Sequence, residues 1–324
     1  MTDTANPGQI GAVVIGRNEG ARLLTCLRSA ESQVDVLVYV DSGSTDNSVA
    51  EAKALGAEVI LLDTSLPFTA ARARNTGLEH LMDRADPPEF VQFIDGDCEL
   101  RDGWIAAASA FMTEHPKVAA TGGRRRERFP DATLYNHLTD LEWDSPTGQT
   151  RACGGDVLMR TKALTEVGHY NPTLIAGEEP ELCVRLRQAG WTIWRLDAEM
   201  TWHDADMTRF GQWWLRCKRA GHAYTEGAAM HGAPPERHYV PQLRRAVIWG
   251  LALPLVILLG LLLTPWAALL ALLWPLKTIR LITSGRSPVH ALFLTLGNFA
   301  EAAGVLTYLR KRLSGERSRL IEYK

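Results

Sequence analysis

The sequence contains no Cys-x-x-Cys pair and no excess of positive charge. Its five cysteines stand far apart, so neither a zinc site nor a disulfide framework is indicated. The formal net charge of -2 gives no basic field, and we therefore expect no nucleic-acid partner. The segment Met1–Asn6 is polar and lacks a basic region, so no secretory signal is expected. The polar part of the chain is predicted to lie in the reducing cytosol.

Three loop motifs of common enzyme classes are also missing. The chain has no Gly-x-Gly-x-x-Gly loop, no phosphate loop of the nucleoside triphosphatases and no Gly-x-Ser-x-Gly elbow. The usual signatures of dinucleotide-binding proteins, P-loop enzymes and α/β-hydrolases are therefore absent.

What the sequence does have is a long apolar block in its last third. Ala246–Leu263 is about as long as a bilayer span, and Trp266–Leu276 continues it after a short break. Basic residues on both flanks favour a helical hairpin with both ends in the cytoplasm, with a single kinked span as the alternative. Val289–Leu309 either spans once or lies in the interface. We therefore predict a cytosolic domain over 1–240 and a membrane-associated helical region over 241–324.

Ahead of this block, apolar strand patterns alternate with amphipathic helix patterns. Strands buried on both faces of a parallel sheet read as short apolar runs, as these do. The alternation predicts an α/β fold, a mostly parallel Rossmann-like sheet with helices on both faces. Expected strands are 10–15, 36–40, 57–62, 90–94, 118–121 and 191–196, and expected helices include 70–81, 104–114 and one from about 180 to 190.

Carboxylates directly follow two of these strands. Asp41 ends the second strand, and Asp95 and Asp97 follow the fourth. Because parallel strands end at a common sheet edge, where α/β folds bind ligands, these groups are expected to meet there. Paired carboxylates need a positive partner, and oxygen ligands suit Mg²⁺ or Mn²⁺, with a solvated turn as the alternative. Asn18, after the first strand, is predicted to cap the next helix.

A second acidic focus, Glu178-Glu179, precedes Pro180 at the predicted start of a helix. The helix dipole favours ionised carboxylates there, and one near the crevice can act as a general base. An ordinary first-turn acid cluster is the alternative. His203, after a late strand, either completes a metal site begun by Asp97 or is a hydrogen-bonded surface residue.

Other polar features have weaker interpretations. The basic cluster 124–128 fits phosphate contact and a solvated loop equally well. The Gly154-Gly155 pair suggests close backbone approach, with a tight turn as the alternative. Tryptophans beside basic residues near 212–216 suit a membrane interface or a sugar phosphate, or simple packing. The candidates for acceptor or sugar contacts are Gly155, Asp156, Gln212, Trp214 and Arg216.

In their order along the chain, five short motifs resemble glycosyltransferase family 2, whose members have the GT-A fold. The resemblance covers residues 10 to about 220. Each motif is weak alone, but five in the right order and spacing favour functional roles for the acidic residues. The motifs are Val14–Glu19, Asp41–Asp46, Ala73–Gly77, Phe93–Asp97 and Gly177–Leu182, the last followed by Arg185-Leu186 and Gly190.

The resemblance implies a nucleotide-sugar donor, with a UDP-sugar as the first candidate. By position, Asp41 looks like the carboxylate that recognises the base, and Arg74 looks like a nucleotide contact. Asp95 would face the ribose or the metal. Asn18 and Glu19 belong to the first motif and are further candidates for donor binding.

The resemblance also implies a metal ion and a catalytic base. Mg²⁺ or Mn²⁺ would be bound by Asp97, with Asp95 and His203 as further ligands. Glu179 looks like the base that accepts the proton of the acceptor hydroxyl, so that a single displacement inverts the anomeric centre. The family often has Glu-Asp where this chain has Glu178-Glu179, so the choice between the two glutamates stays open.

We expect a membrane-attached, inverting glycosyltransferase in cell-surface polysaccharide biosynthesis. Its catalytic domain would face the cytosol at the cytoplasmic membrane and act on a lipid-linked or glycan acceptor. The Gln-x-x-Arg-Trp motif of processive synthases is rearranged in 212–216, which argues against processive synthesis. The rivals are a non-catalytic membrane adaptor and a sugar nucleotidyltransferase, but Gly16–Gly20 is a poor match to the basic, glycine-rich loop that the latter needs.

Overall fold

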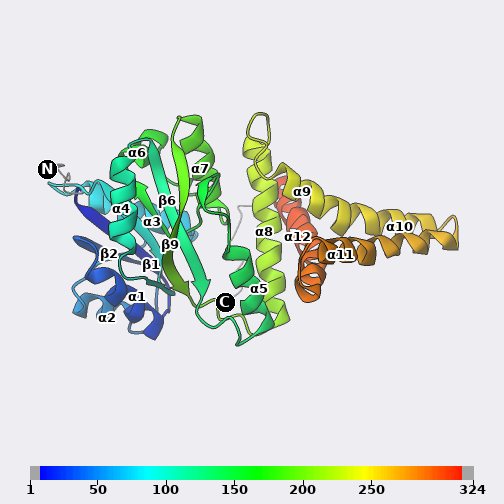
Figure 1. The fold of residues 1–324 in the computed structure, drawn as a ribbon, viewed down its shortest axis with the longest axis horizontal. Coiled ribbons are helices and arrows are strands. Elements are labelled where there is room, and N and C mark those ends of the chain that lie inside the picture. The colour runs from blue at the N-terminus through cyan, green and yellow to red at the C-terminus, as the bar shows by residue number, and fades with distance from the viewer. Residues whose placement is uncertain (1–7, 316–324) are drawn as a thin grey trace. The chain divides into compact units, whose positions relative to one another are not determined.

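The computed structural model describes residues 8–315, which divide into two compact units. Unit 1, Met1–Asp206, contains the sheet, and unit 2, Met207–Lys324, is helical (Figure 1). The predicted boundary near residue 240 differs from this division, because helix α8 (Phe210–His231) falls into unit 2.

A nine-stranded mixed sheet forms the centre of unit 1. Its strand order is β3-β2-β1-β4-β8-β6-β9-β5, and β7 pairs with β9. The first four strands in this order are mutually parallel, which confirms the predicted α/β architecture, and β8 then runs antiparallel to both of its neighbours. The strands are β1 (Ile10–Gly16), β2 (Val36–Asp41), β3 (Glu58–Leu61), β4 (Phe90–Asp95), β5 (Cys98–Leu100), β6 (Val118–Glu127), β7 (Gly148–Thr150), β8 (Val157–Arg160) and β9 (Thr192–His203).

Helices cover both faces of this sheet, as predicted. Alternate residues of a strand point to opposite faces, so Val13 of β1 packs in one core cluster and Val14 in the other. The first cluster includes residues of α3, α6 and α7, and the second includes residues of α1 and α4. The helices of unit 1 are α1 (Ala21–Glu31), α2 (Ser48–Ala54), α3 (Ala70–Met82), α4 (Trp104–Glu114), α5 (Leu134–Trp143), α6 (Thr161–Val167) and α7 (Glu178–Gln188).

The strand register brings the predicted carboxylates to one edge of the sheet. Gly16 at the end of β1 pairs with Asp41 of β2, and Ile15 pairs with Asp95 of β4. The expectation that these carboxylates share the carboxyl edge of the sheet is therefore confirmed. His203 reaches the same region from β9, where it pairs with Cys98.

The prediction that Asn18 caps the first helix is wrong. Helix α1 begins after Gly20, without a side-chain hydrogen bond at its cap. Asn18 has a left-handed backbone with φ 58°, and its side-chain oxygen accepts a hydrogen bond from the Thr45 amide at 2.7 Å. The Asn18 carboxamide thus joins the loop after β1 to the loop after β2, because the parallel pairing of these strands holds the two loops side by side.

Unit 2 contains three helices that are long and apolar enough to cross a membrane, judged over residues 8–315. They are Val240–Leu261, Pro265–Thr283 and Pro288–Ser314. The first two are the arms of the predicted hairpin. The first span consists of α9 (Val240–Val247), η1 (Ile248–Ala252) and α10 (Leu253–Leu261). The second span consists of η2 (Pro265–Leu272) and α11 (Leu273–Thr283), and the third span is α12 (Pro288–Ser314).

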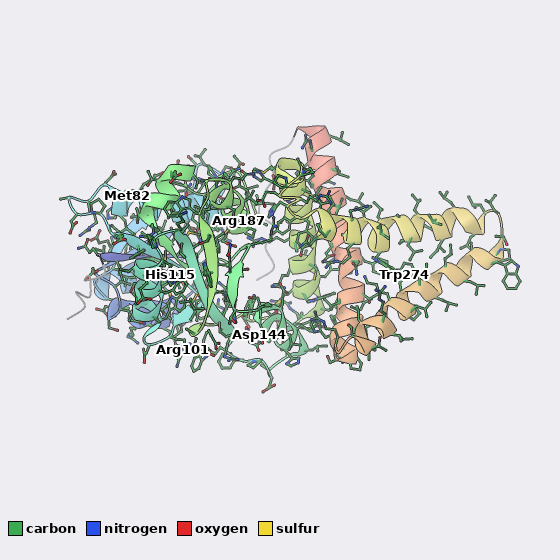
Figure 2. The ribbon with its side chains drawn as sticks, turned by 45° about the horizontal axis from the view of Figure 1, so that its top comes forward. Met82, Arg101, His115, Asp144, Arg187 and Trp274 are labelled. Atoms are coloured by element: carbon green, nitrogen blue, oxygen red, sulfur yellow. The ribbon has the colours of Figure 1, made fainter. Side chains whose placement is uncertain are left out.

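Close backbone approach joins α8 to α12 within unit 2. A side-chain carbon on Gly221 would overlap the backbone of Glu301, and one on Gly304 would overlap that of Lys218. Small residues at crossing points are typical of helices packed in membranes. Trp274 of α11, labelled in Figure 2, donates its indole N–H to a backbone carbonyl oxygen at 3.1 Å.

Candidate active site

Asp41 organises the loop that follows β2. Its side chain is buried, and Oδ1 accepts a hydrogen bond from the Tyr39 hydroxyl at 2.9 Å. Oδ2 accepts the amide hydrogens of Gly43 at 3.0 Å and Ser44 at 2.8 Å. The carboxylate therefore fixes the turn at the end of the strand. In the loop after β1, Glu19 forms an ion pair with Arg22 at 3.0 Å.

Arg74 joins two of the predicted acidic residues. Its guanidinium contacts Asp95 Oδ1 at 2.7 Å and Glu178 Oε1 at 2.8 Å, while the residue is only 2% exposed. Burial alone would lower the pKa of Arg74, but the two carboxylates raise it above its usual value. Gly155 confirms the predicted close approach, since a side-chain carbon there would come 2.7 Å from Arg74 Nη2.

A second guanidinium belongs to the half-buried Arg125, which the sequence did not single out from its basic cluster. It contacts Asp156 Oδ2 at 2.6 Å and lies 3.6 Å from Asp95 Oδ2. Asp156 is fully buried and also accepts hydrogen bonds from the Thr201 hydroxyl at 2.9 Å and the Asp95 amide at 3.1 Å. Burial would raise the pKa of Asp156, but Arg125 and His203 hold it below its usual value. Asp156 therefore holds the end of β4 in place through its hydrogen bond to the Asp95 amide.

Asp97 and His203 form a candidate metal site. His203 Nε2 lies 3.3 Å from Asp97 Oδ1, and the ligand atoms of Asp97, Cys98 and His203 all lie within 4.8 Å of one another. Within residues 8–315, the buried Nδ1 of His203 has no hydrogen-bond partner. The Asp97 carboxylate suits Mn²⁺ or Mg²⁺, and the His203 imidazole adds a nitrogen ligand that favours the transition metal Mn²⁺, so these residues fit such an ion. The oxygens of Asp95 face Arg74 and Arg125 instead.

The two adjacent glutamates at the start of α7 have different partners. Glu178 forms the ion pair with Arg74. Glu179 is 3% exposed, and its Oε1 accepts hydrogen bonds from the Cys153 amide at 2.9 Å, the Cys153 thiol at 3.2 Å and the Cys183 thiol at 2.7 Å. The fold thus separates the pair, one glutamate on the arginine side and the other beside two thiols.

The remaining sugar or acceptor candidates lie in unit 2. Gln212 is the N3 residue of the capping box that starts α8 at Arg209, and its side-chain oxygen accepts the amide hydrogens of Thr208 at 2.8 Å and Arg209 at 3.0 Å. Trp214 packs against Phe210 with ring centroids 5.9 Å apart, and the half-buried Arg216 follows on the same helix.

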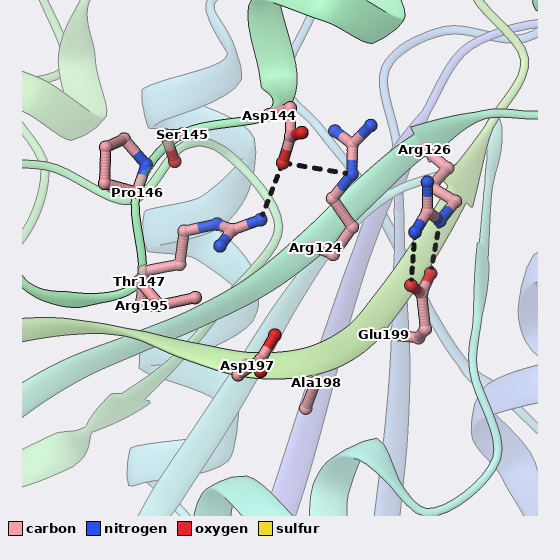
Figure 3. A pocket seen from close by; sticks show the side chains of 10 residues that line it. All are labelled: Arg124, Arg126, Asp144, Ser145, Pro146, Thr147, Arg195, Asp197, Ala198 and Glu199. Atoms are coloured by element: carbon pink, nitrogen blue, oxygen red, sulfur yellow. Dashed lines mark hydrogen bonds and ion pairs between the residues drawn. The ribbon is translucent and has the colours of Figure 1, made fainter.

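A polar cavity of about 540 Å³ lies over β6 and β9. Figure 3 shows Arg124 and Arg195 turned toward Asp144, each 3.5 Å from Asp144 Oδ1, and Arg126 paired with Glu199 at 2.7 Å. Its lining residues do not include the Asp97 or Glu179 groups, so it is separate from the acidic cluster.

Comparison with known proteins identifies one matching family and several relatives of the chain. Residues 12–164 match the family described as Glycosyl transferase family 2. The Pre-mycofactocin glycosyltransferase of Mycobacterium tuberculosis (strain ATCC 25618 / H37Rv) is 28% identical over 182 residues, covering 52% of this chain and 36% of that protein. A TPR repeat-containing protein of Synechococcus elongatus is 29% identical over 139 residues, covering 43% and 32%. The chain thus spans about a third of the length of these curated relatives.

Solved structures share the fold at low sequence identity. The mannosyltransferase PcManGT from Pyrobaculum calidifontis, in complex with GDP-Man and Mn²⁺, has a TM-score of 0.60 and 18% identity, covering 96% of this chain and 88% of that one. S. aureus TarS 1–349 has a TM-score of 0.52 and 16% identity, covering 95% and 92%. Glucosyl-3-phosphoglycerate synthase from Mycobacterium tuberculosis, in complex with Mg²⁺ and UDP, has a TM-score of 0.51 and 18% identity, covering 70% and 80%.

Proposed function

Because the chain belongs, through residues 12–164, to glycosyltransferase family 2, we propose that it transfers a sugar from a nucleotide donor to an acceptor hydroxyl with inversion of the anomeric carbon. One observation carries this proposal. Asp41 and Asp95 flank the end of β1, and Arg74 joins Asp95 to Glu178. The carboxylates that we assign to the donor therefore lie at one sheet edge, and Arg74 links that edge to Glu178, the neighbour of the proposed base Glu179.

We assign the donor to this edge. Asp41 fixes the loop against which the base of the nucleotide would lie, and Asp95 would reach the ribose. Asp97 and His203 would hold Mg²⁺ or Mn²⁺, which when bound stabilises the negative charge of the leaving diphosphate. The solved PcManGT and glucosyl-3-phosphoglycerate synthase complexes contain such ions with GDP-Man and UDP respectively. We propose that the donor is a UDP-sugar, and a GDP-sugar is the second donor to be tested.

Glu179 is the proposed catalytic base. Its Oε1 is held by the three donors from Cys153 and Cys183, so we assign proton uptake to Oε2. Glu178 is the weaker candidate, because an ion pair with Arg74 favours the charged carboxylate. One carboxylate that deprotonates the attacking hydroxyl supports a single displacement, and a single displacement inverts the stereocentre.

The acceptor is proposed to be a lipid-linked or glycan intermediate at the cytoplasmic face of the membrane. The support is the set of three helices with the length and composition of membrane spans. Basic residues around the apolar block favour the cytosol for the catalytic part, residues 1–240, and the helices after 240 would attach it to the membrane. A step in cell-surface polysaccharide assembly would use such an arrangement.

The test uses membranes that carry the full-length chain. They are incubated with labelled UDP-sugars and GDP-sugars and Mn²⁺, and lipids are then extracted. We expect label in the lipid fraction with wild type and with the exposed control Asp102→Asn, and a loss of about 100-fold or more with Glu179→Gln. Label confined to soluble products would refute the lipid-linked acceptor. Unchanged transfer by both Glu179→Gln and Asp97→Ala would contradict the assigned catalytic site, and absence of transfer by wild type with every donor would favour a non-catalytic adaptor.

A further inference from the structure

Two thiols surround the carboxylate of Glu179. The sulfurs of Cys153 and Cys183 and a Glu179 oxygen all lie within 4.8 Å of one another. Neither cysteine forms a disulfide. Glu179 and Cys183 are four residues apart on α7, whereas Cys153 lies 26 residues before Glu179, so the sequence alone does not show that the three meet.

Two different elements bring these groups together. Cys183 follows Glu179 by four residues on α7, so the two side chains lie on the same face of the helix. Cys153 lies in the loop before β8, and its amide as well as its thiol contacts Glu179. Cys183 is buried, whereas Cys153 is half-buried. The cluster is therefore anchored on a helix and reachable from the loop side.

We infer that Cys153, Cys183 and Glu179 form a binding site for a thiophilic divalent cation such as Zn²⁺ or Cd²⁺. Two sulfurs with one oxygen select these ions over Mg²⁺ and Mn²⁺, which prefer oxygen ligands. Three protein ligands and one open position are typical of catalytic zinc sites. This cluster is distinct from Asp97 and His203, because the two ligand groups share no residue.

The spacing of the ligand atoms suits this geometry. Tetrahedral zinc with sulfur and oxygen ligands places neighbouring ligand atoms about 3.3–3.8 Å apart. The observed sulfur-to-oxygen distances are 3.2 Å for Cys153 and 2.7 Å for Cys183. Small side-chain rotations that move each sulfur away from the Glu179 oxygen by less than about 1 Å would bring these two distances to the tetrahedral spacing. Binding replaces each thiol proton by a metal–sulfur bond and releases two protons. Because both thiols must lose their protons to bind the ion, affinity should fall as the pH is lowered.

The consequence for activity rests on the proposed function. A cation bound to Glu179 occupies the carboxylate that we assign as the base, so Zn²⁺ or Cd²⁺ should inhibit transfer while Mn²⁺ supports it. The protein would then respond in opposite ways to hard and soft divalent ions through two separate sites.

Cadmium titration of the purified full-length protein in detergent tests the site without any activity measurement. The buffer contains a phosphine reductant, and sulfur-to-cadmium charge-transfer absorption in the ultraviolet reports binding. We expect Cd²⁺ binding that Zn²⁺ displaces, with a sulfur-dependent component that is at least 10-fold weaker in Cys153→Ser and in Cys183→Ser. Cys217→Ser is the matched control, because Cys217 is also half-buried but lies in unit 2, and it should bind as wild type does.

Each outcome decides a defined point. Equal binding by wild type and both serine variants would overturn the site. Loss of two titratable thiols in metal-free protein, regained with reductant, would also overturn it in favour of a disulfide. Cadmium binding that leaves sugar transfer unchanged would keep the site but contradict Glu179 as the base. Normal transfer that needs Glu179 without any cadmium binding would overturn the site and leave the proposed function standing.

Discussion

Gly155 and Arg74 are fitted to each other: a side-chain carbon on Gly155 would lie 2.7 Å from Arg74 Nη2 and 3.3 Å from Asp95 Oδ2. The missing side chain leaves room for the guanidinium that joins Asp95 to Glu178. The geometry of the whole acidic cluster thus depends on one position without a side chain.

Gly155→Ala should therefore destabilise unit 1 and weaken donor binding. Arg74 is held at both ends, so it cannot move aside freely, and we expect a loss of about 1–3 kcal/mol. Thermal unfolding with and without UDP measures both effects. Gly211→Ala is the matched control, because nothing lies within 4 Å of a side-chain carbon there, and it should stay within about 0.5 kcal/mol of wild type. Equal melting temperatures for the two variants would contradict the fit.

Removal of the Arg74 side chain should cost much more than removal of a surface partner. Arg74→Gln leaves Asp95 and Glu178 without their shared counter-charge, and we expect a loss of about 3 kcal/mol. Arg84 pairs with Glu58 at 2.7 Å with about a third of its side chain exposed, so Arg84→Gln should cost less than about 1 kcal/mol. Denaturant unfolding of the two variants checks the order, and similar losses would show that the Arg74 network does not stabilise the unit.

Asp97→Asn should abolish stabilisation by divalent cations. At a concentration 100 times its dissociation constant, an ion that binds only the folded protein stabilises it by about 2.7 kcal/mol. We expect melting temperatures to rise with Mn²⁺ in wild type and in Asp102→Asn but not in Asp97→Asn. His203→Gln should weaken the Mn²⁺ effect more than the Mg²⁺ effect, since imidazole suits Mn²⁺ better. If Mn²⁺ still raised the melting temperature of Asp97→Asn, the metal site would have to lie elsewhere in the protein.

Glu226 on α8 should make unit 2 less stable as the pH rises. Burial raises the pKa of Glu226 from 4.5 to about 7, although Lys311 opposes the shift. Between these values the folded state binds more protons than the unfolded state, so stability falls from about pH 4.5 to pH 7 and stays low above it. Glu226→Gln removes this cost and should gain about 1–3 kcal/mol over wild type at pH 8 but little at pH 4.5. Melting curves of both proteins at pH 4.5 and pH 8 measure this difference. A gain in stability that is the same at both pH values would contradict the raised pKa of Glu226.

The sequence was sufficient for the strands that hold the donor edge. The apolar runs of β1, β2 and β4 end at polar residues, and parallel pairing then requires Asp41 and Asp95 to meet. The helices on both faces follow from the same alternation. The antiparallel insertion of β8 could not be predicted, because a four-residue run such as Val157–Arg160 carries no periodicity that distinguishes strand from helix.

The site residues that were missed depend on long-range register. Arg125 lies in a run of basic residues that fits phosphate contact and a solvated loop equally well, but its side chain turns toward Asp156, whereas Arg124 turns toward Asp140. Irregularities between β6 and β9 occur at these positions, and local sequence does not reveal them. The Cys153 thiol beside Glu179 was missed for the same reason, since only the packed fold brings the loop before β8 to α7.

The position of β4 inside the sheet sets an order for hydrogen exchange. β4 is paired on both sides, by β1 and β8, whereas β3 pairs only with β2 in the described part of the sheet. Amide hydrogens of β3 should therefore exchange with deuterium before those of β4. Fraying from the β3 side would release the Asp41 turn while the Asp95–Asp97 turn stays anchored, so a partly opened molecule would lose the proposed nucleotide-base contact before the proposed metal ligands.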